Sequence, residues 1–143
     1  MLTHKEFEKL RLSQFVHPSE IVELADWEFL DREWIGEAIG FTEWLRPQSS
    51  PHQLGSIALD LEALPAEVIE TCLSCIGLPL RRHMTFAQIV SLFGEPLRTL
   101  SFVVDRDTYE FRIGVPDVYD LSCTVLGDGG LSYLVVTVPQ GGA

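Results

Sequence analysis

The 143 residues of the chain suit one domain, and a hydrophobic fraction of 46% supplies a packed core and excludes a disordered chain. Acidic residues outnumber basic residues by 21 to 10, giving a net charge of −11, and no stretch reaches the roughly 20 apolar residues of a membrane-spanning helix. Three cysteines, an odd number, favour reduced thiols. His4, Lys5 and Glu6 stand where a signal peptide would need a basic and then an apolar segment. We therefore predict a cytoplasmic protein without membrane association.

The first element in chain order is predicted by a capping box at Thr3 and Glu6, followed by apolar residues at helical spacing that indicate a helix over residues 4–15. Residues 26–45 also carry apolar side chains every three or four positions, as an amphipathic helix would. Two glycines within this stretch would each cost such a helix about 1 kcal/mol. The sequence therefore leaves residues 26–45 open between a helix and an extended segment.

The middle of the chain contributes one strand and one helix. Residues 46–55 are rich in proline and serine, which predicts an exposed loop. Residues 56–61 then read as a short strand. Pro65 suits a first helical position, so we predict a helix from there through about Cys75.

The clearest local signal is a short helix over residues 86–93. Thr85 and Gln88 have the spacing of a capping box, in which each side chain bonds the other residue's backbone amide. Gly94 can adopt the left-handed conformation that ends a helix, and Pro96 prevents the helix from resuming.

After Pro96 the apolar period changes from 3.6 to 2, which is typical of half-buried antiparallel strands. Four strand-like runs follow, separated by turn signals such as 105–107 and 127–130. The last run, 131–138, is apolar at nearly every position, so we expect it to be central or covered. The predicted fold is a single α+β domain over 1–143: N-terminal helices and a short strand, then a helix packed on a four-stranded antiparallel sheet.

The helix over 86–93 and the predicted sheet each present one apolar face, and we expect the two faces to pack on each other. The helix would contribute Ile89, Val90 and Phe93. The strands would contribute Tyr109, Phe111, Leu121 and Val125.

Charge is distributed unevenly along the chain. Twelve carboxylates and only two arginines lie between Glu20 and Glu70. No basic stripe with interleaved aromatic residues is present, which argues against nucleic-acid binding. A solvated acidic face is the simplest interpretation, and an electrostatic patch that steers a basic protein partner is the sharper one. The candidate partner-binding residues are Glu20, Glu23, Asp26, Glu28, Glu37 and Glu67.

Cys72 and Cys75 form the only short chemical motif, a C-x-x-C. A redox pair would need the N-terminal end of a helix, whereas these residues lie at the C-terminal end of their predicted helix. A zinc site would need two further ligands, and His83 and Cys123 have no supporting pair. We therefore predict that both cysteines are buried, reduced and metal-free core residues, with a thiol or metal-binding protein as the alternative.

No catalytic constellation is found. The chain contains no G-x-S-x-G, P-loop, G-x-G-x-x-G or H-E-x-x-H motif, and its four histidines show no paired spacing. We predict no catalytic residues, no metal ligands and no cofactor. An enzyme with a noncontiguous site stays open at this point.

One resemblance covers residues 78–138. Its motifs are Leu78–Leu80, Met84–Thr85, Ile89–Pro96 and Tyr109–Phe111. Their order resembles the helix-plus-hairpin unit of the SmpA/OmlA and beta-lactamase-inhibitor-like proteins, where a G-M-T-x-x-x-V-x-x-x-x-G-x-P type stretch precedes antiparallel strands. The resemblance implies a noncatalytic binder or assembly factor with a sheet face available for contact. The chain departs from that pattern in having His83 where those families have glycine, and in lacking their lipoprotein or secretion signal.

These observations predict a noncatalytic intracellular protein-interaction module, such as an inhibitor or immunity-type protein, that presents an acidic surface to a basic protein partner.

Overall fold

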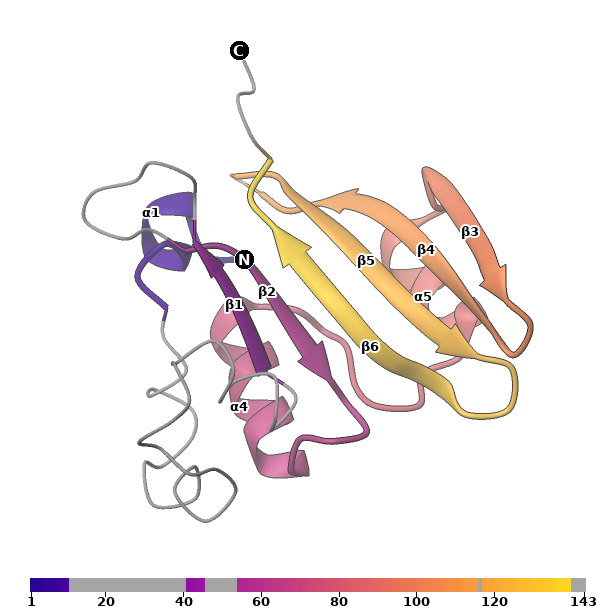
Figure 1. Ribbon diagram of the computed structural model, residues 1–143. Coiled ribbons are helices and arrows are strands. Elements are labelled where there is room, and N and C mark those ends of the chain that lie inside the picture. The colour runs from indigo at the N-terminus through magenta and orange to yellow at the C-terminus, as the bar shows by residue number, and fades with distance from the viewer. Residues whose placement is uncertain (11–40, 46–53, 116, 140–143) are drawn as a thin grey trace.

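A computed structural model describes residues 1–10, 41–45, 54–115 and 117–139 (Figure 1). Three helices and six strands lie in these ranges. The helices are α1 (His4–Phe7), α4 (Ala66–Ile76) and α5 (Phe86–Phe93). The strands are β1 (Phe41–Leu45), β2 (Leu54–Asp60), β3 (Arg98–Val103), β4 (Arg106–Ile113), β5 (Tyr119–Leu126) and β6 (Gly130–Thr137).

The six strands form one antiparallel sheet in the order β1-β2-β6-β5-β4-β3. The α+β class is confirmed, but the expectation of four strands is wrong, because β2 pairs with β6 and β1 pairs with β2. β6 is therefore a central strand with a neighbour on each side. This position explains its nearly continuous apolar sequence.

Helix boundaries follow the local signals closely where capping residues set them. α5 spans the predicted residues 86–93, with both capping-box bonds between Thr85 and Gln88 present. α4 begins after Pro65 and ends at Gly77, which has a φ of 88°. α1 is shorter than predicted: its capping box is present, but the helix ends at Phe7 and residues 11–15 lie outside the described part. The helix that begins at this cap is only one turn long. It ends at Phe7, whose side chain is buried in the core.

Residues 26–45, which the sequence left open, are extended at least over β1. The remainder of that stretch lies outside the described residues.

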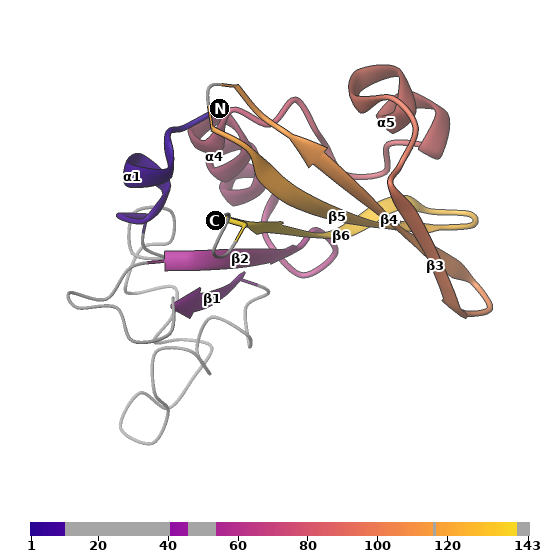
Figure 2. The same ribbon diagram turned by 90° about the horizontal axis from the view of Figure 1, so that it is seen from above.

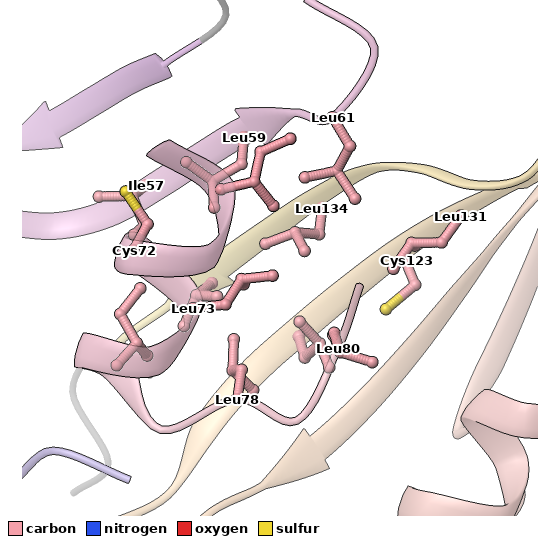
Figure 3. Close-up of a cluster of buried hydrophobic side chains, with 14 of the residues drawn as sticks. Ile57, Leu59, Leu61, Cys72, Leu73, Leu78, Leu80, Cys123, Leu131 and Leu134 are labelled. Atoms are coloured by element: carbon pink, nitrogen blue, oxygen red, sulfur yellow. The ribbon is translucent and has the colours of Figure 1, made fainter. Parts of the chain in front are cut away.

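All three helices lie on the same side of the sheet (Figure 2). Alternate strand residues point toward them, such as Ile57 and Leu59 of β2 and Leu134 and Val136 of β6. Figure 3 shows Ile57, Leu59 and Leu134 in one cluster with Cys72 and Leu73 of α4. One continuous core thus joins both halves of the sheet to the helical layer.

The expected packing of α5 on the strands is confirmed for Ile89 and Phe93, while Val90 is not among the side chains packed against the core. Ile89 is fully buried, and the ring of Phe93 lies 5.7 Å from that of Phe111. Tyr109, Leu121 and Val125 belong to or pack against the same core, and Val90 is half-buried.

The cysteine prediction is half wrong. Cys72 is buried, but Cys75 is exposed. The apolar stripe of α4 is centred between Cys72 and Ile76, and the three-residue spacing puts Cys75 at the margin of that stripe, facing solvent. Both cysteines have free thiols.

Candidate functional site

Of the six predicted partner-binding residues, the structure describes only Glu67. It is exposed in the first turn of α4. The other five lie outside the described residues: Glu20, Glu23, Asp26, Glu28 and Glu37.

A hollow of about 650 Å³ lies between the first turn of α5 and the tips of two hairpins. The tips are the β3–β4 turn at Asp105 and the β5–β6 turn at Gly127, whose backbone N–H donates to the Asp105 carbonyl at 2.9 Å. We call this site the acidic hollow and define it by Phe86, Asp105, Asp107, Tyr109 and Asp128.

Two aromatic rings form one wall of the acidic hollow. Phe86 and Tyr109 stack with centroids 4.2 Å apart and an interplanar angle of 17°. Phe86 is the first residue of α5, so the capping box fixes its position, and Tyr109 projects from β4. The Tyr109 hydroxyl donates to Asp107 Oδ2 at 3.4 Å. Burial, and then the Asp107 charge, raise the pKa of Tyr109, so the hydroxyl is a neutral donor.

The carboxylates of the acidic hollow outnumber its single guanidinium by three to one. Asp105 is bound by Arg106 through two hydrogen bonds of 3.0 and 3.1 Å, which lower the pKa of that carboxyl. Asp107 and Asp128 form no ion pair with a described basic residue. The hollow therefore carries a local negative charge beside an apolar wall, an arrangement that attracts a cation.

The floor of the acidic hollow is made by a close backbone contact between His83 and Gly130. His83 N–H donates to the Leu131 carbonyl at 2.9 Å, and Leu131 N–H donates to the Met84 carbonyl at 2.8 Å. His83 has a φ of 69°, a left-handed conformation that non-glycine residues rarely adopt. Its ring lies 3.2 Å from Glu62 Oε1. These bonds join the segment before α5 to the start of β6, which positions Phe86.

The opposite face of the sheet has balanced charges. Arg98 pairs with Glu110 at 2.9 Å and Arg112 with Asp120 at 3.1 Å. Hydroxyl pairs, such as Thr108 with Thr124 at 3.0 Å, continue the same face. This pattern is typical of a solvated antiparallel sheet.

The two buried thiols, Cys72 and Cys123, are poorly suited to nucleophilic chemistry. Burial raises the pKa of Cys123 to about 12, and burial together with the nearby Cys75 does the same for Cys72. A thiolate nucleophile needs the opposite shift. Within the described ranges, no group of three or more His, Cys, Asp or Glu side chains could hold a metal ion.

From the sequence, residues 105–107 are predicted only as a turn between two strands, and no binding role is predicted for Asp105 or Asp107. The missed signal is topological, because alternate turns of an antiparallel meander lie at the same end of the sheet. The β3–β4 and β5–β6 turns therefore lie at the same end of the sheet, where Asp105 and Asp128 line one hollow.

Comparison of the chain with protein-family models, with curated proteins and with solved structures found no match. In the part of the chain that the structure describes, no helix has the length and apolar character to cross a membrane.

Proposed function

We propose that this chain is a noncatalytic intracellular protein-interaction module, of the inhibitor or immunity type, that binds a basic protein partner. The observation that carries the proposal is the acidic hollow, in which three aspartates surround a stacked pair of aromatic rings. A lysine or arginine side chain entering it would meet carboxylates at its charged end and Phe86 and Tyr109 along its aliphatic stem. The free thiols support an intracellular location.

Long-range attraction adds to this local fit. The net charge of −11 would raise the encounter rate with a basic protein and oppose the approach of an acidic one. The acidic segment between Glu20 and Glu70 would contribute to that attraction, while the acidic hollow would provide the short-range contacts.

The conformation of His83 supports the resemblance to the SmpA/OmlA and beta-lactamase-inhibitor-like unit. Those families have glycine at this position, and a left-handed φ of 69° is a conformation that glycine adopts without strain. Noncatalytic binding is the property that the resemblance would bring to this chain.

The test begins with capture of the partner from cell extract, followed by measurement of its association rate against ionic strength. In the variant Asp105→Asn/Asp107→Asn/Asp128→Asn, we expect an association rate about fivefold or more below wild type at low salt, because steering charge and contact charge are both lost. A second variant, Glu20→Gln/Glu23→Gln/Glu28→Gln, should lower the rate without changing the dissociation rate.

Glu95→Gln is the single-charge control, since Glu95 is exposed, lies outside the acidic segment between Glu20 and Glu70, and does not line the acidic hollow. The proposal would be contradicted if the association rate stayed the same at all salt concentrations and in both triple variants. The carboxylates would then be solvated surface charges without a role in binding.

A further inference from the structure

The arginines of the described residues fall into two groups. Arg98, Arg106 and Arg112 each form an ion pair with a carboxylate. Arg81 and Arg82 form none with the described residues. They are neighbours in sequence, and both line one groove of about 240 Å³. Among the described arginines these two are the ones without an ion pair, in a chain with a net charge of −11.

This arginine groove is lined by Ala66, Ile69, Glu70, Leu73, Leu80, Arg81 and Arg82. Its walls are apolar because Ile69 and Leu73, one turn apart on α4, face Leu80 on the segment that follows the helix. Gly77 ends α4 in a left-handed conformation, which lets this segment turn back beside the helix. The Leu73 and Leu80 side chains appear in Figure 3.

Arg82 has one hydrogen-bond donor without an acceptor among the described residues. One terminal nitrogen, Nη2, donates to the Leu64 carbonyl at 2.7 Å, which holds the guanidinium in place. Its Nε is buried and has no hydrogen-bond partner among the described residues. A buried donor of a charged group without an acceptor is costly and rare in folded proteins.

We infer that the arginine groove binds a segment of a partner protein that presents an aliphatic side chain next to a carboxylate. The aliphatic group would occupy the space between Ile69, Leu73 and Leu80, and the carboxylate would accept from Arg81 and Arg82. Two arginines against Glu70 give the groove a local charge opposite to that of the whole chain, which selects an acidic segment. The volume suits one side chain, since sites for larger ligands start near roughly 300 Å³.

This second surface is independent of the acidic hollow, with which it shares no lining residue. Arg82 lines the arginine groove and the next residue, His83, lines the hollow beside α5. A partner with a basic and an acidic-aliphatic segment would contact both.

The test is an NMR titration of the ¹⁵N-labelled full chain with the peptide acetyl-Ala-Leu-Asp-Ala-amide and with its neutral analogue acetyl-Ala-Leu-Asn-Ala-amide. We expect saturable shifts of backbone amides between residues 66 and 82, together with a shift of the Arg82 Nε–H resonance, for the aspartate peptide. The asparagine analogue should bind about tenfold more weakly.

Substitutions of the charged residues that line the groove measure how much charge contributes to peptide binding. Arg81 is exposed, so Arg81→Gln should keep the fold and weaken the aspartate peptide about threefold to fivefold. Glu70→Gln should tighten it about twofold, because a repelling carboxylate is removed. The triple aspartate variant of the acidic hollow should leave the titration unchanged, so failure at one surface is distinguishable from failure at the other.

Two results would overturn the inference. One is the absence of saturable shifts in residues 66–82. The other is equal binding of the aspartate and asparagine peptides, which would show that Arg81 and Arg82 do not recognise a carboxylate.

Discussion

Gly130 and His83 meet backbone to backbone, and this contact decides which residues each position accepts. A Cβ added to Gly130 would collide with the carbonyl carbon and oxygen of His83, and Gly130 also has a φ of 72°. Neither atom of the His83 carbonyl can move aside as a flexible side chain would. Residue 130 therefore has to be glycine for two reasons: its φ is positive, and the His83 backbone leaves no room for a Cβ.

Gly130→Ala is expected to lower the free energy of unfolding by about 2–4 kcal/mol, since strain at a left-handed residue adds to a backbone collision. Urea denaturation followed by circular dichroism measures this loss. Gly127→Ala is the matched control in the same turn: its added Cβ would lie 3.6 Å from the Asp105 carbonyl, an ordinary contact. Equal losses in the two variants would contradict the steric explanation.

Substitutions of His83 compare two effects on stability, the strain of its left-handed backbone and the contact of its ring with Glu62. His83→Gly should raise the free energy of unfolding by up to about 1 kcal/mol, because glycine adopts a φ of 69° without strain. His83→Ala should lower it, because alanine keeps the strain and loses the contact with Glu62. The order glycine, histidine, alanine in urea midpoints is the expected outcome, and a glycine variant less stable than the alanine variant would reverse it.

At the scale of elements, α5 shows what a sequence can specify locally. Its start and end follow from Thr85, Gln88 and Gly94, all within a few residues of the helix, so the predicted boundaries matched the structure. α1 has the same cap but ends at Phe7, because a cap sets where a helix begins and later contacts set how far it runs.

Thr85→Ala should destabilise the protein by about 1 kcal/mol, since the hydroxyl that accepts from the Gln88 amide at 3.2 Å is lost. Thr85→Ser keeps that acceptor and should stay within a few tenths of a kcal/mol of wild type. Thermal unfolding of the three proteins at one pH provides the comparison. If the serine variant loses as much as the alanine variant, the cap is not the cause.

Pairing between distant elements could not be read from local pattern. The strand at 56–61 was expected, but its pairing with β6, some eighty residues later in the chain, depends on which apolar strand has an unpaired side. The candidate site shows the same limit. Asp105 and Asp128 are each ordinary in their own turns, and they form a site only because the sheet brings the turns together.

At the scale of the whole molecule, the buried thiols predict that the free energy of unfolding decreases at alkaline pH. Burial raises the pKa of Cys72 and Cys123 from 9.0 to about 12. Below pH 9 both thiols are protonated in the folded and unfolded chain, so their full contribution to stability is present. Between pH 9 and 12 the unfolded chain releases their protons first, and stability should fall by up to about 1.4 kcal/mol per pH unit for each thiol.

Urea denaturation of the reduced protein between pH 8 and 11.5 measures this slope. Cys123→Ala should be less stable at pH 8, because the core loses a buried atom, yet its stability should decline less steeply above pH 9. Tyr119 adds to the decline above pH 10, since burial raises its pKa to about 12. A wild-type stability that stays flat up to pH 11.5 would contradict the burial of these groups.

The central position of β6 has a consequence for biosynthesis. β2 cannot pair with β6 until the ribosome has translated residues 130–137. Until then β1 and β2 cannot join the rest of the sheet. During that delay the apolar residues of β2 and α4 lack the strand that covers them. Nascent chains stalled before residue 130 should therefore bind chaperones, and release of the finished strand should end that dependence.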